Sequence, residues 1–248
     1  MKNGIKQLVL QPRDITLLKY LARFRILDRE QAALLSGFHS RSRVNVRLAK
    51  LRDAGLVVRF YTATGTGSRR SIYALSKRGA EEIQTAYRPL KWRSDSIILG
   101  NAFAAHQLAL VDLYIVAAQN GEIVWRTPTL PLSKSLPIIP DAIITNSAHS
   151  FFVELDLGTE SLSVFSRKAA SYIRLAMSGE FHSLIPHPRF SVLVVASDET
   201  RLQALRRTIA KQTSKLFWFA TVETIKGQGF WSTSWLRPSR DALSPPGE

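Results

Sequence analysis

The sequence contains no cysteine among its 248 residues, which excludes a disulfide framework and a zinc site built from thiolates. It also contains no run of 18 apolar residues, so no membrane-spanning helix is expected. Residues 1–11 lack the long apolar core of a signal peptide. These absences predict a protein that works in the cytoplasm and has no membrane partner.

Acidic residues are scarce in the first part of the chain. Residues 1–95 contain 20 Lys and Arg but only 7 Asp and Glu, whereas residues 96–248 contain 14 and 12. Most of the formal net charge of +15 therefore belongs to the first segment. Basic charge gathered in this way is typical of a surface that binds a polyanion such as DNA.

The pattern of the basic segment predicts three helices, a hairpin and a fourth helix. The first helices are expected over residues 15–24 and 29–35, with Asp14 and Asp28 as N-caps. The third helix is expected over residues 40–54, and Gly55 ends it. Strands follow at residues 56–61 and 69–75, and Ser76 can cap the fourth helix.

The third predicted helix has one buried and one basic stripe. Val44, Leu48 and Leu51 repeat at helical spacing and form the apolar stripe, while basic residues one position earlier predict an exposed stripe. Arg and Asn side chains near the start of such a helix can reach base edges in the major groove, and other cations can bind phosphates. The residues expected to contact DNA are Arg41, Arg43, Asn45, Arg47, Lys50, Arg69 and Arg70.

Two runs resemble the recognition-helix and wing signatures of bacterial winged helix-turn-helix proteins. They are Leu48-x-x-Leu51-Arg52-x-Ala54-Gly55-Leu56-Val57 and Tyr73-x-Leu75-x-x-x-Gly79. The resemblance implies double-stranded DNA as the partner. A winged helix used for protein contacts is the alternative, which the low acid content of the third helix disfavours.

The second part of the chain predicts an α/β fold with a mixed sheet. Helices are expected over residues 101–118, 161–177 and 199–212, and strands over residues 121–126, 140–144, 151–156, 190–196 and 216–222. The predicted domains are a winged helix-turn-helix over residues 1–86, a linker over residues 87–100, an α/β domain over residues 101–236 and a disordered tail over residues 237–248.

Three acidic residues fall on two neighbouring predicted strands. Asp141 opens the first strand, and Glu154 and Asp156 lie two residues apart on the second, which places both on one face. Carboxylates on a mostly apolar sheet are costly unless a cation or hydrogen-bond donors compensate them. We therefore interpret this stretch as a site. Lys168 and Tyr172 share a face of the following helix, and Tyr172 is interpreted as a core residue whose hydroxyl finds a partner.

This order of elements is similar to the restriction-endonuclease-like core, whose motif is Pro-Asp, a spacer and then Asp/Glu-x-Lys. The resemblance implies Asp141 and Glu154 as ligands of Mg²⁺, a hard cation that prefers oxygen and activates water for attack on a phosphodiester. The motif lysine falls at position 156, where this chain has Asp. Three alternatives stay open: Lys168 supplies the missing charge, Asp156 is a third ligand, or the site is no longer catalytic. The catalytic candidates are Asp141, Glu154, Asp156 and Lys168.

A further resemblance covers nearly the whole chain. The winged-helix pattern, Pro140-Asp141 and the run Val153-Glu154-Leu155-Asp156-x-Gly158-Thr159-Glu160-Ser161 resemble the replication-relaxation family of plasmids and mobile elements. Leu157 departs from the Arg common there. The resemblance implies a DNA-handling role in replication, mobilisation or transposition, with a homodimer or proteins of the element as further partners. The alternatives are a Mg²⁺-dependent nicking endonuclease and a transcriptional regulator with an inactive dimerisation domain.

Overall fold

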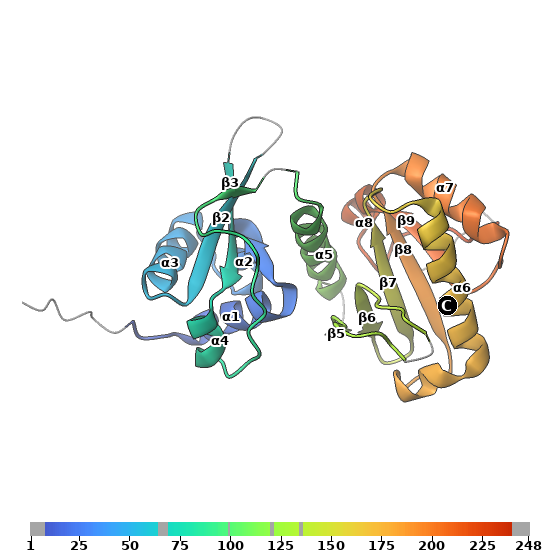
Figure 1. The fold of residues 1–248 in the computed structure, drawn as a ribbon, viewed down its shortest axis with the longest axis horizontal. Coiled ribbons are helices and arrows are strands. Elements are labelled where there is room, and N and C mark those ends of the chain that lie inside the picture. The colour runs from blue at the N-terminus through green and yellow to red at the C-terminus, as the bar shows by residue number, and fades with distance from the viewer. Residues whose placement is uncertain (1–7, 64–68, 99, 120–121, 134–135, 240–248) are drawn as a thin grey trace, which may run out of the picture. The chain divides into compact units, whose positions relative to one another are not determined.

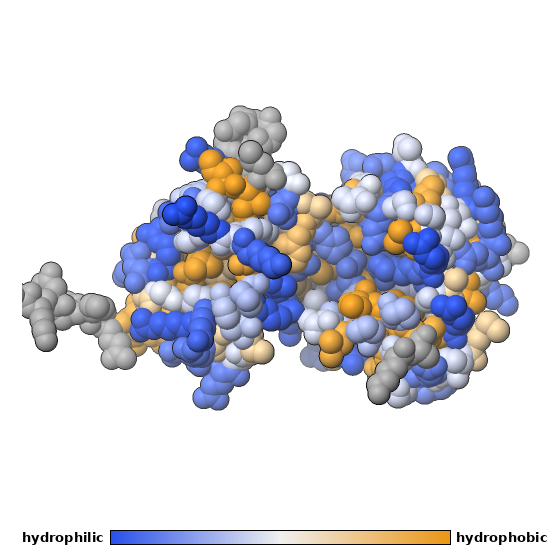
Figure 2. All heavy atoms as spheres, viewed as in Figure 1, coloured by the Kyte–Doolittle hydropathy of each residue, from blue (hydrophilic) through white to orange (hydrophobic). Residues whose placement is uncertain are grey.

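The computed structural model describes residues 8–63, 69–98, 100–119, 122–133 and 136–239. The chain divides into two compact units, residues 1–112 and 113–248, and the division falls within helix α5 (Ala102–Ala118). Among the described residues, no helix is long and apolar enough to cross a membrane. Figure 2 shows mainly hydrophilic side chains on the visible surface, with separate hydrophobic patches.

The first unit combines a small sheet with helices, as Figure 1 shows. Its helices are α1 (Pro12–Phe24), α2 (Arg29–Leu35), α3 (Arg41–Asp53) and α4 (Lys77–Glu82). Its strands are β1 (Ile26–Asp28), β2 (Val57–Ala63), β3 (Arg69–Leu75) and β4 (Ile97–Ile98), in the order β1-β3-β2-β4. The antiparallel hairpin β2–β3 pairs Val57 with Leu75 at its base and Ala63 with Arg69 at its tip.

Local signals explain where the helices of the first unit begin and end. Asp28 caps α2 by accepting a hydrogen bond from the Gln31 backbone N–H at 2.8 Å, and Ser76 caps α4 by accepting one from Gly79 at 2.9 Å. Gly55 follows α3 at φ 72°, a conformation that glycine adopts without strain. The prediction of Asp14 as an N-cap is wrong, because α1 begins three residues earlier than predicted and Gln11 is its N-cap.

The second unit is an α/β layer built on a five-stranded mixed sheet. Its strands are β5 (Val124–Arg126), β6 (Ala142–Thr145), β7 (Ser150–Asp156), β8 (Phe190–Ala196) and β9 (Phe217–Thr221), paired in chain order. The pairs β5–β6 and β6–β7 are antiparallel, whereas β7–β8 and β8–β9 are parallel. The remaining elements are α6 (Leu162–Ser178), the 3₁₀ turn η1 (Glu180–Ser183), α7 (Glu199–Ala210) and α8 (Val222–Gln228).

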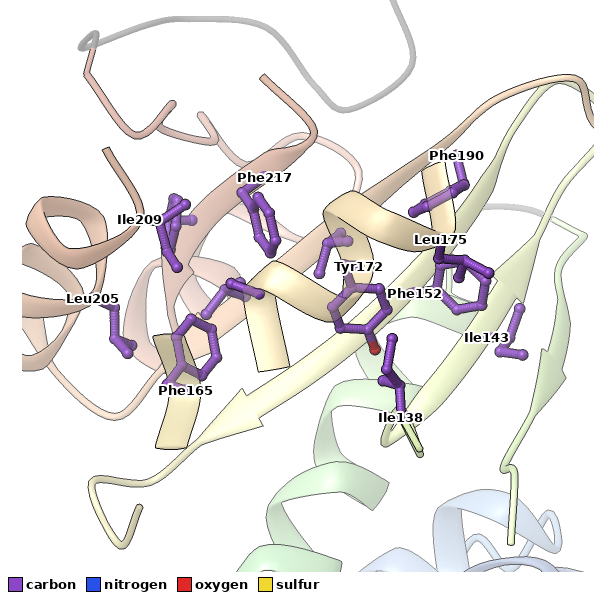
Figure 3. Packing of buried hydrophobic residues seen from close by; sticks show 14 of the residues in the cluster. Ile138, Ile143, Phe152, Phe165, Tyr172, Leu175, Phe190, Leu205, Ile209 and Phe217 are labelled. Carbon is purple, nitrogen blue, oxygen red and sulfur yellow. The ribbon is translucent and has the colours of Figure 1, made fainter. Parts of the chain in front are cut away.

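Helices α6 and α7 cover one face of this sheet (Figure 1). The apolar layer between these helices and the sheet contains Phe152 of β7, Phe165 and Leu175 of α6, and Phe217 of β9, as the close-up in Figure 3 shows. Tyr172 is 1% exposed and lies in the same layer. Burial of this layer fixes α6 on the sheet, and so fixes every polar side chain that α6 directs toward β7.

The observed architecture is the predicted one, α/β with a mixed sheet in its second part. The first unit has the predicted order of three helices, a hairpin and a fourth helix. The predicted linker, residues 87–100, contains β4, and its Trp92 packs against Phe60 with ring centroids 5.3 Å apart. The division into domains at these residues stays a prediction. Of the predicted disordered tail, residues 240–248 lie outside the described part of the chain.

Candidate functional site

The acidic candidates of the second unit lie where β6 and β7 pair. The Asp141 backbone N–H donates to the Val153 carbonyl at 3.0 Å, immediately before the antiparallel pair of Ala142 with Val153. Asp141 lies close enough to Glu154 for its negative charge to contribute to raising the pKa of Glu154. One carboxylate oxygen of Asp141 accepts the Leu155 backbone N–H at 2.8 Å. The pairing therefore brings together two acids that are 13 residues apart in the sequence.

Glu154 is buried and has a partner for each carboxylate oxygen. It is 3% exposed, and its two oxygens accept the Lys168 ammonium at 2.7 Å and the Tyr172 hydroxyl at 2.5 Å. Both partners come from consecutive turns of α6, as their spacing predicted. Figure 3 shows the Tyr172 ring in the apolar layer, with its oxygen at the edge of that layer. Its expected place in the core, with a bonded hydroxyl, is confirmed.

Burial controls the protonation of this cluster. It raises the pKa of Glu154 from an ordinary value of 4.5 to about 7, although the positive charge of Lys168 opposes the shift. Burial alone would lower the pKa of Lys168, but the charge of Glu154 and its hydrogen bond outweigh burial and raise it. Lys168 therefore stays protonated at neutral pH, and it neutralises Glu154 whenever Glu154 ionises.

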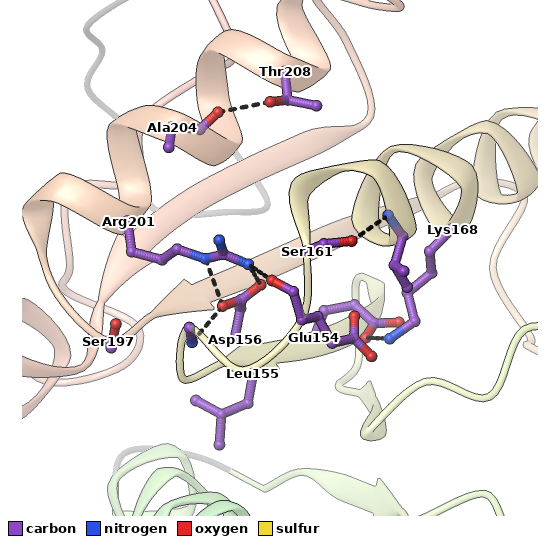
Figure 4. Close-up of polar contacts among 12 residues, drawn as sticks. Glu154, Leu155, Asp156, Ser161, Lys168, Ser197, Arg201, Ala204 and Thr208 are labelled. Carbon is purple, nitrogen blue, oxygen red and sulfur yellow. Dashed lines mark hydrogen bonds and ion pairs between the residues drawn. The ribbon is translucent and has the colours of Figure 1, made fainter.

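Asp156 forms a separate pair with a residue that the sequence did not single out. Its two oxygens accept the Arg201 Nε and Nη2 groups at 2.8 and 2.7 Å, a bidentate arrangement that Figure 4 shows. One of these oxygens also accepts the Gly158 backbone N–H at 2.7 Å, and the Arg201 guanidinium donates to the Glu160 carbonyl at 2.5 Å. Asp156 thus fixes the loop that follows β7.

Arg201 could have been found only through sheet topology. It lies on the first turn of α7, just after β8 ends, and β8 is parallel to β7. The carboxyl ends of parallel neighbours meet at one edge of a sheet, which brings a residue 45 positions away to Asp156. The Arg201 side chain is only 15% exposed because it is held in this ion pair.

The oxygens of this cluster fit a resident divalent cation poorly. Asp156 is held by Arg201 and the loop backbone, and both oxygens of Glu154 already accept hydrogen bonds from protein donors. In the part of the chain that the structure describes, no group of three Asp, Glu or His side chains is placed to hold a metal ion. Hard cations such as Mg²⁺ need several available oxygens. Mg²⁺ binding by Asp141 and Glu154 stays a prediction.

The basic candidates of the first unit lie on α3 and β3. Arg43, Asn45 and Lys50 are exposed on α3, next to Val46, an apolar side chain that is 56% exposed. Asn45 and the exposed Arg69 and Arg70 line one hollow of about 350 Å³, together with Asp28, Arg29, Glu30, Ser71 and Tyr73. The fold therefore brings together candidates from α3 and the hairpin.

Three of the predicted cations form ion pairs. Arg41 binds Glu30 at 3.0 Å, but both side chains are more than half exposed, so the pair is weak. Arg70 pairs with the buried Asp28 while its own side chain stays 44% exposed.

Arg47 differs from the predicted exposed stripe. Its side chain is only 13% exposed, because it binds the carboxylate of Asp14, which is 0% exposed. The Arg47 Nε donates to Asp14 at 2.7 Å, and an Nη2 group donates to the Val9 carbonyl at 2.8 Å. A buried carboxylate needs a cation as its partner. The spacing of residues along α3 could not reveal this contact, because Asp14 lies on another helix.

Fold and site together define a two-unit α/β protein with a basic helical unit and a sheet unit that buries paired acids. The replication-relaxation family model matches residues 18–187, and the chain belongs to this family. Membership suggests a role in the replication or mobilisation of a plasmid or mobile element. No curated protein and no solved structure matches the chain.

Proposed function

We propose that this protein binds double-stranded DNA of a plasmid or mobile element and recognises a specific site with α3. The observation that carries the proposal is the shared surface of Asn45, Arg69 and Arg70, which come from α3 and β3. Its role would be in replication initiation, mobilisation or transposition, processes in which a protein must first find one place on a duplex. The proposed location is the cytoplasm.

The exposed face of α3 supports base readout. Arg43 and Asn45 present the groups that pair with guanine and adenine edges in the major groove, and Val46 offers an apolar contact for a thymine methyl group. The buried Val44, Leu48 and Leu51 hold the helix from its other side. A rigidly mounted helix with this mixture of side chains suits sequence-specific binding.

The surrounding cations support backbone contacts. Arg41, Lys50, Arg69 and Arg70 are all exposed, and phosphate contacts from such residues orient a protein on DNA without reading sequence. Arg47 takes a different role in this proposal: it holds α3 against α1 through Asp14. Its contribution to DNA binding is therefore through the position of the helix.

The test is a binding titration of the full chain with a short duplex that carries a site selected from random sequences. Replacing Arg43→Ala with Lys50→Ala should weaken binding at least tenfold, about 1.4 kcal/mol or more. The matched control is Arg167→Ala with Arg207→Ala, which removes two exposed cations of the second unit. Equal affinity of the Arg43/Lys50 variant and the wild type at physiological salt would overturn the proposal.

Metal-dependent DNA nicking is the second candidate, and one observation favours it. Lys168 lies 2.7 Å from Glu154, and the charge of Asp141 acts on both side chains, so three of the four catalytic candidates lie near one another. The engaged oxygens of Glu154 and the pairing of Asp156 with Arg201 place this candidate second. If the wild type nicked a plasmid with Mg²⁺ or Mn²⁺ and the variant Asp141→Ala with Glu154→Ala did not, DNA nicking would become the favoured function.

A transcriptional regulator whose second unit only dimerises is the remaining alternative. A homodimer and replication, transfer or transposition proteins of the element are proposed partners. Light scattering of the protein with and without a DNA site separates a dimer that exists beforehand from one that forms on DNA. Binding of inverted half-sites would accompany a two-fold symmetric dimer.

A further inference from the structure

A second set of cations surrounds a hollow in the second unit, here called the Trp218 hollow. Its volume is about 700 Å³, within the range of ligand sites in proteins. Ser150, Phe190 and Leu216 line it, so it lies where β7, β8 and β9 begin. The paired acids Glu154 and Asp156 lie toward the opposite end of β7, which makes the Trp218 hollow a separate place on the fold.

The charge of the Trp218 hollow has one sign. Arg189, Lys215 and Arg237 line it, and no acidic residue does. Within the described ranges, none of these three cations forms an ion pair with a carboxylate. In contrast, Asp156 and Glu154 each have a basic partner in the same unit. Cations left together without acids favour an anionic ligand.

The Trp218 hollow also contains a flat stacking surface. The guanidinium carbon of Arg237 lies 3.4 Å from the centroid of the Trp218 ring, so the guanidinium stacks on the indole. The indole N–H donates to the Ser191 hydroxyl at 3.3 Å, which fixes the ring plane. Arg237 lies opposite Trp218 because the neighbouring residues Phe219 and Leu236 form an antiparallel bridge.

The wall that α6 forms is apolar and adaptable. Ile173 and Met177 of α6 line it, and the Met177 side chain is 82% exposed although methionine is ordinarily buried. The flexible thioether of methionine can pack against flat rings of different shape. An anionic ligand that also has a flat, partly apolar ring fits such a wall.

We propose that the Trp218 hollow binds a nucleotide of single-stranded DNA, with its base on the Arg237–Trp218 stack and its phosphates on Arg189 and Lys215. Proteins that bind single strands combine cations along the backbone with flat side chains on which bases stack. An acidic peptide would satisfy the cations but would leave the stacking surface without a function. The proposal does not depend on duplex binding by α3.

The experiment measures binding of a fluorescent oligothymidylate to the full chain. The background protein carries Arg43→Ala and Lys50→Ala, so that the cations proposed to contact duplex DNA are absent. Adding Lys215→Glu and Arg189→Glu, both at exposed positions, should weaken binding at least tenfold. Replacing them by Ala should reduce the slope of log affinity against log salt by about 1.4, because two phosphate contacts are lost.

Arg237→Lys separates stacking from charge. It keeps the positive charge but loses the planar guanidinium, so the affinity should fall while the salt slope stays unchanged. Arg167→Ala with Arg207→Ala, outside the Trp218 hollow, is the matched control and should leave both quantities unchanged. Circular dichroism of each variant verifies that it is folded.

Three results would overturn the proposal. They are no binding of the oligonucleotide by the background protein, equal affinity after the Lys215 and Arg189 reversals, and competition by an acidic peptide as effective as that by unlabelled oligothymidylate. Competition by thymidine monophosphate distinguishes a nucleotide within a DNA strand from a free nucleotide as the ligand. Weak competition by the monophosphate supports a strand as ligand, whereas competition as strong as that of the oligonucleotide would overturn the assignment to a strand.

Discussion

The two units of this protein place their charged side chains in contrasting environments. On α3 and β3 of the first unit, Arg43, Lys50 and Arg69 are exposed to solvent. On β7 of the second unit, Glu154 and Asp156 are 3% and 6% exposed, and each is held by a basic residue from a helix. Exposed cations can exchange water for phosphate at little cost, whereas buried pairs mainly hold helices in place.

Arg47 shows that the contrast between the two units depends on the surroundings of each charged side chain and not on its residue type. It lies on the same helix as Arg43, yet it behaves like Arg201 of the second unit, because each neutralises a buried carboxylate. An arginine that is itself mostly buried in such a pair has little freedom to reach a ligand. Arg70 also meets a buried acid, Asp28, but its side chain stays 44% exposed, so the distinction between binding and structural cations follows from how deeply each cation is buried with its partner.

The largest effect is expected from removing Glu154. The variant Glu154→Ala leaves the Lys168 ammonium without its carboxylate, and breaking a buried pair costs about 3–5 kcal/mol. Urea unfolding measures the loss. The variant Glu154→Ala with Lys168→Met should recover part of it, because no unpaired charge remains. A loss of less than about 1 kcal/mol in the single variant would show that the pair behaves like an exposed one.

Arg47→Met should have a somewhat smaller effect on stability, about 3 kcal/mol, since Asp14 keeps its hydrogen bond from the Gln11 backbone. Arg43→Ala, on the exposed face of the same helix, should change stability by less than about 0.5 kcal/mol. Thermal or urea unfolding of the two variants tests the contrast within one element. Similar stabilities of the two variants would show that Arg47 contributes no more to the fold than the exposed Arg43.

The third effect is a pH dependence of the unfolding free energy. Because the pKa of Glu154 is raised from 4.5 to about 7 in the folded state, the folded protein retains a proton that the unfolded chain releases. This contribution to stability is complete below pH 4.5 and is lost as the pH rises to about 7. At about 1.4 kcal/mol per pKa unit, the expected loss is about 3 kcal/mol relative to the variant Glu154→Gln with Lys168→Met, which lacks both charges. If the unfolding free energies of the wild type and the double variant changed with pH in the same way, the raised pKa of Glu154 would be contradicted.

Sequence patterns predicted the long elements well and the short ones poorly. The apolar stripe of α3 and its stop at Gly55 gave a helix within one residue of the observed bounds. The three-residue strand β1 and the two-residue strand β4 were missed, because such segments are too short to show alternation. Helix α8 was missed because Val222, its first residue, continues the apolar run of β9.

The candidate site was predictable only where its residues are close together in the sequence. Local spacing placed Lys168 and Tyr172 on one helix face and Glu154 and Asp156 on one strand face. The structure brings Lys168 and Tyr172 to Glu154. The partners of Asp14 and Asp156 lie 33 and 45 residues away. Only the packing of helices against each other and the parallel pairing of β7 with β8 bring those partners together.

The most direct test of duplex binding by the first unit is the salt dependence of its affinity for DNA. If Arg41, Lys50, Arg69 and Arg70 each neutralise one phosphate, the slope of log affinity against log salt for a duplex should be about −3.6 or steeper. Fluorescence anisotropy of the full chain with a labelled duplex, over a series of salt concentrations, gives this slope. A steep slope that becomes shallower in Lys50→Ala is the predicted result, and an affinity that does not change with salt would contradict the account.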